Sequence, residues 1–347
     1  MTHSLRPIAR SQRGFTLVEL MLAMLLGLLV AMAAGGIFLS NRRTYGSTEA
    51  INRIQENQRT AFELMARDIR EAGANPCIRF SASVQPVMQI VAPDTEFWSR
   101  FPGGIHGDDG TGANGSDAVT VYSDGGTSYS VGAHKKPGDV LTVDSGTTGL
   151  TNGQVLMVCN TSHAIAFIAS GITSGGTTVG HDSTSNCGKG LTLSPDATKC
   201  TATESGPGYC FWLGAAATAA DTLNCPAGIG ASPAFVVTPV SVSWSVAANG
   251  RGGNSLYRTV GGTASEIAEG VNSLDISYKI GAAANYVSAA DVTAANAWSL
   301  VSAVRVQMAI QAVQGALSSG DTRGTGGVTL SRNLDDYIVL RNHQDIQ

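Results

Sequence analysis

The stretch RGFTLVELMLAMLLGLLVAMAAGGIFL, residues 13–39, places a glutamate near the start of a run that is otherwise apolar. As an α-helix, the run from Phe15 to Leu39 reaches about 37 Å, which is enough to cross the roughly 30 Å hydrocarbon core of a bilayer. The residues before it carry three arginines and no acidic residue. We therefore expect the N-terminus to stay in the cytoplasm and the rest of the chain to lie outside it.

The glutamate, Glu19, needs an explanation, because a carboxylate at the bilayer centre costs about 2.5–3.5 kcal/mol. One explanation is a position near the interface, where the side chain reaches the lipid headgroups. The other is cleavage after Gly14, which creates an α-amino group at Phe15 that can pair with a carboxylate on the same or a neighbouring helix. No A-x-A cleavage site follows the apolar run, so we expect the helix to remain in the mature protein.

The stretch RGFTLVEL, residues 13–20, resembles the type III signal of type IV prepilins and of type II secretion pseudopilins. This resemblance implies that a prepilin peptidase cleaves between Gly14 and Phe15 and methylates the new amine of Phe15. It also implies that Glu19 pairs with the N-terminus of an adjacent subunit during assembly.

Other segments are similar to the PilW family of minor type IV pilins. Pro76 precedes the first cysteine, where that family commonly has a glycine, and this departure concerns one turn. The resemblance does not extend to residues 171–232. It implies a membrane-anchored pilin that works with other minor pilins, the major pilin and a PilY-type tip adhesin. The segments that carry the resemblance are NRIQENQRTAFELMARDIREAGANPC at 52–77, EGVNSLDISY at 269–278, AWSLVSAVRVQMAI at 297–310 and LRN at 340–342.

Apolar residues recur at three- and four-residue steps between residues 47 and 72, which predicts an amphipathic extension of the membrane helix. Gly73 suits the C-cap of this helix. Gly27, Gly35 and Gly36 weaken the apolar half, and they indicate either a bend or local melting there or close packing between helices in lipid.

Beyond Cys77 the pattern changes to alternation of apolar and polar residues, which is typical of half-buried antiparallel strands. The predicted fold is therefore α+β: a long N-terminal membrane-spanning helix packed against an antiparallel β-sheet head, as in pilins, with a disulfide-rich insertion. The expected parts are a cleaved leader (1–14), a transmembrane helix (15–39), its amphipathic extension (40–73) and an extracytoplasmic head (74–347) with an insertion at about 171–232. The strand candidates are VTPVSVSWSVA, SLDISYKI, VRVQMAIQA, DAVTVY, DVLTV, QVLMVC and DYIVL.

The cysteines are even in number and all follow the membrane helix, so an oxidising compartment predicts disulfides. We expect Cys77 to pair with Cys159 and the other four to staple the insertion, which has few apolar residues of its own. Zinc is disfavoured, because the sequence has neither a C-x2-C pair nor a histidine cluster at ligand spacing. The six are Cys77, Cys159, Cys187, Cys200, Cys210 and Cys225.

The remaining composition argues against nucleic-acid binding and catalysis. Without the leader the chain has 19 Lys and Arg against 26 Asp and Glu, a net charge of 19 − 26 = −7. GTGANG at 110–115 precedes a strand and opens no helix, unlike a dinucleotide loop. GDDGTGANGSD lacks the alternating carboxylates and closing glutamate of a calcium loop. No G-x-S-x-G or H-E-x-x-H motif occurs, and we predict a non-enzymatic protein without metal or cofactor.

The leading hypothesis is a minor pilin that takes part in initiation and assembly of type IV pili and supports motility and adhesion. It is expected to lie in the inner membrane with a periplasmic head, and then in a pilus at the cell surface. One alternative is a J-type pseudopilin of type II secretion, which the long insertion disfavours. The other is a membrane-anchored adhesin whose insertion presents Tyr209, Phe211 and Trp212 to a ligand, although such aromatics more often form a local core around Cys210.

Overall fold

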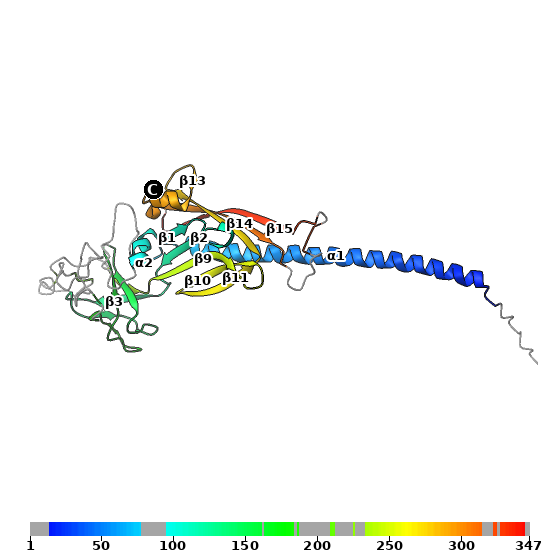
Figure 1. The fold of residues 1–347 in the computed structure, drawn as a ribbon. Coiled ribbons are helices and arrows are strands. Elements are labelled where there is room, and N and C mark those ends of the chain that lie inside the picture. Colours follow the sequence, from blue (N-terminus) through cyan, green and yellow to red (C-terminus); the bar gives the residue numbers. More distant parts are fainter. Residues whose placement is uncertain are drawn as a thin grey trace, which may run out of the picture. The chain divides into compact units, whose positions relative to one another are not determined.

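A computed structural model describes residues 14–77, 95–161, 163–183, 186, 209–211, 225, 233–313, 322–324 and 327–343. The chain divides into two compact units. The first comprises residues 1–53 and 312–330, and the second comprises residues 54–311 and 331–347. Figure 1 shows the ribbon, with the long helix α1 contributing to both units.

Helix α1, Leu17–Arg70, is continuous over 54 residues. It runs without interruption through Gly27, Gly35 and Gly36, so the local melting considered from the sequence does not occur in the structure. A Cβ atom added at any of these glycines would meet nothing within 4 Å, which leaves that part of the helix surface open. The first unit also contains an antiparallel bridge between Arg323 and Thr329.

The described residues of the second unit form three antiparallel sheets. The first has the strand order β1-β2-β9-β10-β11, with β1 at Ile105–Asp108, β2 at Ala118–Ser123, β9 at Val240–Ala248, β10 at Asn254–Val260 and β11 at Thr263–Glu269. The second has the order β13-β12-β14-β15, with β13 at Tyr286–Val287, β12 at Val271–Ile280, β14 at Val301–Gln311 and β15 at Ser331–Val339. Short helices are α2 (Thr95–Arg100), η1 (Phe101–Gly103), η2 (Ala113–Gly115), α4 (Ala289–Ala294) and η3 (Trp298–Leu300).

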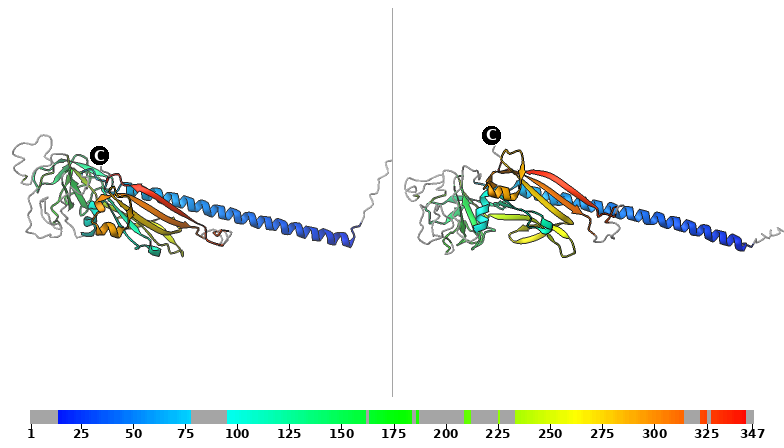
Figure 2. Two further views of the ribbon diagram at one scale, coloured as in Figure 1. Left: turned by 90° about the horizontal axis from the view of Figure 1, so that it is seen from above. Right: turned by 45° about the horizontal axis from the view of Figure 1, so that its top comes forward.

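The C-terminal part of α1 lies beside these two sheets (Figures 1 and 2). The last residues of the described chain cover its end, because Arg341 N donates to Arg70 O at 3.4 Å and Asn342 Nδ2 donates to Ala72 O at 3.1 Å. Gly73 follows with a left-handed φ of 70°, as expected of a helix C-cap. The helix buries Ile54, Ala61, Met65, Ala66 and Ile69, and Ala72 just after it is buried as well.

The third sheet has the order β6-β5-β8-β3-β4-β7 and lies at one end of the second unit (Figure 2). An additional bridge pairs Ser170, after β6, with Gly180, after β7. The two ends of the sheet are thereby joined, and it closes into a small barrel. Its strands are β3 at Ser128–Ala133, β4 at Leu141–Val143, β5 at Val155–Cys159, β6 at Ala164–Ile168, β7 at Thr178–Val179 and β8 at Phe235–Val237.

The barrel is inserted between two strands that are neighbours in the first sheet. β2 and β9 pair as far as Ser123 and Val240, so the chain leaves and re-enters the sheet at the same edge. The barrel has its own core, which includes Val131, Leu156 and Phe167. The strand candidates from the sequence all form strands. The first barrel strand, β3, precedes the segment at about 171–232 that the sequence indicates as an insertion.

Candidate functional site

The chain around the predicted cleavage site is not helical. Residues 14–16 precede α1, which begins at Leu17. Thr16 and Glu19 contact each other reciprocally: Glu19 N donates to Thr16 Oγ1 at 3.3 Å, and Thr16 N donates to Glu19 Oε2 at 3.3 Å. This pattern is a capping box, in which two otherwise unpaired backbone N–H groups are satisfied at the start of a helix.

The capping box gives Glu19 a role within its own chain. Its carboxylate lies in the first turn of α1, where the helix dipole favours negative charge. This role differs from the two that we expected for Glu19, an interfacial position and a partner amine. The T-x-x-E spacing of Thr16 and Glu19 is the signal that predicts this arrangement.

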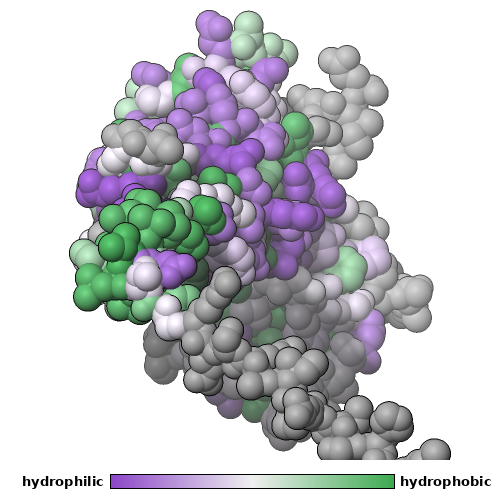
Figure 3. All heavy atoms as spheres, turned by 90° about the vertical axis from the view of Figure 1, so that its right-hand side faces the viewer, coloured by the Kyte–Doolittle hydropathy of each residue, from purple (hydrophilic) through white to green (hydrophobic). Residues whose placement is uncertain are grey.

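The helix segment after the capping box exposes its apolar side chains. Phe15 is 85% exposed, and large apolar residues up to Leu39 are exposed as well. In Figure 3, which faces the N-terminal side of α1, hydrophobic side chains (green) gather in one group. By length and composition α1 can cross a membrane. An apolar surface of this size requires lipid or other helices around it.

A partly buried ion pair joins the other end of α1 to the first sheet. Asp68 accepts hydrogen bonds from Arg258 Nε at 2.6 Å and Nη2 at 3.2 Å. Trp244 Nε1 donates to the same carboxylate at 3.0 Å. Asp68 lies on the apolar face of the helix, between Met65 and Ile69. An acidic residue on an apolar face is the sequence signal that could have predicted a buried partner.

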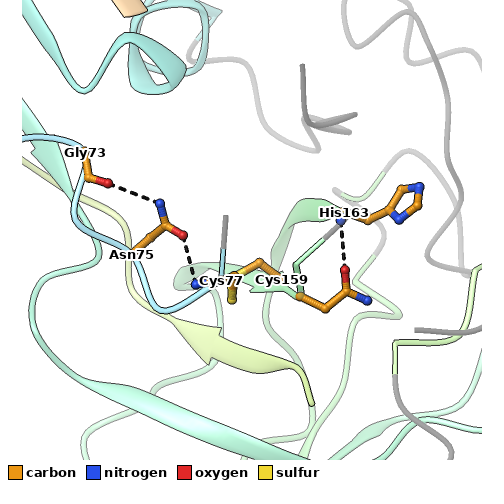
Figure 4. The surroundings of a disulfide bond; sticks show 6 residues. Gly73, Asn75, Cys77, Cys159 and His163 are labelled. Carbon is orange, nitrogen blue, oxygen red and sulfur yellow. Dashed lines mark hydrogen bonds between the residues drawn. A yellow bond between two sulfur atoms is a disulfide. The ribbon is translucent and has the colours of Figure 1, made fainter. Parts of the chain in front are cut away.

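The structure joins Cys77 to Cys159, the pair expected from the sequence (Figure 4). Asn75 orders the approach to this disulfide, since it accepts from Cys77 N at 3.0 Å and donates to Gly73 O at 3.2 Å. The bond links the segment after α1 to strand β5 of the barrel. A core cluster surrounds it and contains Trp98, Phe101, Tyr122, Met157, Ala164, Ala166 and Val237.

The second described disulfide, Cys210–Cys225, lies in the insertion. Tyr209 and Phe211 beside it are buried in the barrel core, so the hypothesis that they form an exposed aromatic platform is wrong. They form the local core that the sequence also indicated. Trp212, Cys187 and Cys200 lie outside the described residues.

A pair of buried histidines lies near this disulfide. His134 Nδ1 accepts from Phe211 N at 3.1 Å, which requires that nitrogen to be unprotonated. His181 Nε2 contacts the carbonyl of Asp139 at 2.7 Å, and the two imidazole centroids are 5.9 Å apart. Burial, and then the charge of His181, lowers the pKa of His134 to about 3.

The acidic loop GDDGTGANGSD uses its carboxylates to hold backbone groups. Asp109 accepts from Ala289 N at 3.0 Å and from Ala290 N at 2.9 Å at the start of α4. Asp117 accepts from Gly110 N and from Ile276 N, which ties the loop to β12. Within the described parts of the chain, no group of three or more His, Cys, Asp or Glu side chains is arranged to hold a metal ion.

Two family comparisons match the chain. Residues 9–39 are similar to the family described as the prokaryotic N-terminal methylation motif, and residues 244–337 are similar to the Type IV Pilus-assembly protein W family. The second match begins in β9 and ends in β15, so it follows the barrel. No curated protein and no solved structure matches.

Proposed function

We propose that this chain, which is a PilW-like pilin with a prepilin-type methylation motif, is a minor pilin that takes part in initiating and assembling type IV pili. The observation that carries the proposal is the start of α1, where Glu19 stands beside a non-helical Gly14–Thr16 segment and ahead of an exposed apolar helix. In a lone subunit, that helix must remain in lipid. In a bundle of like helices, its apolar surface is covered by neighbours.

Processing supplies a positively charged partner for Glu19, in addition to the hydrogen bonds that its carboxylate accepts from Thr16. Cleavage after Gly14 creates an amine at Phe15, and a carboxylate and an amine about 4 Å apart attract by roughly 4 kcal/mol at an effective dielectric of 20, before desolvation is subtracted. The Glu19 carboxylate also accepts from Thr16 N in the capping box. Glu19 therefore has two proposed functions, helix capping and charge pairing between subunits, which mutations can separate. We infer that the capping box stabilises the start of α1 within a subunit and that the charge of Glu19 binds the N-terminus of a neighbouring subunit.

We also infer a location and partners for this chain. Prepilin peptidase is expected to process the chain at the inner membrane, with the N-terminus cytoplasmic and the head periplasmic. Other minor pilins and the major pilin are its expected partners in the filament, with a PilY-type adhesin at the tip. Motility and adhesion follow from the filament rather than from a catalytic site on this chain.

The experiment compares Glu19→Gln and Glu19→Ala in a strain that lacks the chromosomal gene. Both should be cleaved and accumulate in the inner membrane, and both should be depleted from sheared filaments and restore piliation poorly. Glu19→Gln keeps an acceptor for the cap, so its failure isolates the charge. Glu63→Gln, an exposed substitution farther along α1, is the matched control and should behave as wild type.

Two results would contradict the proposal. Wild-type incorporation of both Glu19 variants, at wild-type protein levels, would show that the charge has no role between subunits. A deletion strain with normal pili but defective secretion would assign the chain to a type II secretion pseudopilus instead.

A further inference from the structure

The outer face of the β13-β12-β14-β15 sheet carries a polar groove with a volume of about 340 Å³. The register places five polar side chains and one alanine of the groove in two neighbouring rows across the strands. Asp275, Gln307 and Asp335 form one row, and Ser273, Ala309 and Asn333 form the next. Ser273 and Ala309 have small side chains, and both line the groove.

Some hydrogen-bonding groups in this groove are bonded to neighbouring side chains, and others remain available to a ligand. Arg305 binds Asp335 at two points, Nε–Oδ1 at 2.8 Å and Nη2–Oδ2 at 2.6 Å, and Gln307 Nε2 donates to the same carboxylate at 3.3 Å. This contact fixes the amide of Gln307 with its oxygen left over as an acceptor. Within the described part of the chain, Asp275 faces the groove without a hydrogen-bond partner.

An aromatic surface adjoins the polar rows. Tyr337 follows Asp335 by two residues on β15 and therefore lies on the same face of the sheet. The residue is 52% exposed, its ring centroid is 5.4 Å from that of Tyr286, and Arg305 Cζ lies over the ring at 5.8 Å from its centroid. Such a ring offers a flat apolar surface beside the carboxylate, amide and hydroxyl groups.

These features favour one class of ligand. None of the described residues that line the groove is cationic, and the neighbouring Arg305 is already paired with Asp335, which disfavours anions such as phosphate or sialic acid. Sugar hydroxyls both donate and accept, which suits a row of carboxylate, amide and hydroxyl groups, while the C–H face of a sugar ring suits an exposed tyrosine. We propose that this sheet face binds a neutral saccharide, with Asp275 and Gln307 as hydrogen-bonding residues and Tyr337 as the stacking surface.

This site is separate from the residues that the assembly proposal uses, so the two can fail independently. The probes are maltotriose, lactose and chitotriose, with 3′-sialyllactose as the charged comparator. Saturation-transfer difference NMR on the full chain, in a detergent without a sugar headgroup, reports binding directly. We expect signals on the ring protons of at least one neutral sugar and weaker signals for the sialylated one.

The variants are Asp275→Asn with Gln307→Ala, and separately Tyr337→Ala. Each should weaken binding about tenfold, because a hydrogen bond to a charged group or a ring contact is lost. The matched control is Asp336→Asn, which changes a carboxylate on the same strand but the opposite face and leaves binding unchanged. Unfolding curves identical to wild type would show that the variants fold.

Absence of saturation transfer from every neutral sugar would overturn the proposal, as would equal binding by wild type and the Asp275/Gln307 variant. Loss of surface pili in that variant, without any sugar binding, would likewise overturn it and identify the face as a contact between subunits. The Glu19 experiment is unaffected by any of these outcomes.

Discussion

Asp68 of α1 and Arg258 of β10 form a two-point ion pair, with Nε–Oδ2 at 2.6 Å and Nη2–Oδ1 at 3.2 Å. The carboxylate is 5% exposed and also accepts from Trp244 Nε1. One acidic side chain therefore connects the helix to two neighbouring strands of the first sheet. The family match begins at Trp244, so this contact joins the matched C-terminal part to the helix.

Asp68→Ala should lower the free energy of unfolding of the head by about 3 kcal/mol, because it leaves a guanidinium and an indole N–H without their partner. Urea unfolding of the full chain in detergent, followed by tryptophan fluorescence, measures the change. Glu63→Gln removes an exposed pair with Arg59 and should cost less than about 0.5 kcal/mol. An Asp68→Ala variant as stable as this control would contradict the account.

The mature N-terminus should be Phe15, carrying a methyl group, and Gly14→Val should leave the chain unprocessed. A Cβ at Gly14 meets nothing within 4 Å, so a folding defect does not explain a loss of cleavage. Gly36→Ala is the control, since its site is equally open, and it should be processed normally. Mass spectrometry that finds Met1 or a start beyond Leu39 in the wild-type protein would rule out this processing.

Replacing Cys77 and Cys159 together by serine should cost about 4–5 kcal/mol, against about 3 kcal/mol for Cys210 and Cys225. The reason is loop length: the first pair closes a separation of 82 residues and the second one of 15, and the entropy removed from the unfolded chain grows with that length. Urea unfolding of the two double variants tests the order. The reverse order would show that local packing outweighs loop entropy.

We also expect all six cysteines to be oxidised. Thiol titration of the unreduced, denatured full chain should detect no free thiol. A single reactive thiol would contradict the prediction. Peptide mapping of the same sample would identify the partners of Cys187 and Cys200.

The head should lose stability as the pH falls below about 6.5. Burial lowers the pKa of His134 to about 3, so between these values the unfolded chain binds a proton that the folded chain does not. Stability from this group is present above pH 6.5 and declines toward pH 3. At pH 5 the loss is about 2 kcal/mol.

His134→Asn tests this directly, because its oxygen can still accept from Phe211 N and it does not titrate. The difference in unfolding free energy between pH 7 and pH 5 should shrink by about 2 kcal/mol in this variant. Some loss remains, since burial also lowers the pKa of His343 and of His106. An unchanged difference would show that His134 is not the responsible group.

The main sheets could be predicted because their strands are half-buried. In β9, Val242, Trp244 and Val246 are buried while the serines between them are not, so the alternation is visible in the sequence. Strands of the barrel were harder to recognise. In β6 four successive residues are buried, and β7 has only two residues, so neither shows alternation of useful length.

The sequence by itself determined the elements that depend on local pattern. These are the apolar helix, the processing motif around Gly14, the amphipathic extension and the alternating strands, and each follows from side-chain chemistry at fixed spacing along the chain. Only the tertiary structure decided how distant residues meet. Asp68 lies 190 residues from Arg258, and the groove depends on the register of β12, β14 and β15. Such contacts result from how helix and strands pack around one core, and no local spacing encodes that packing.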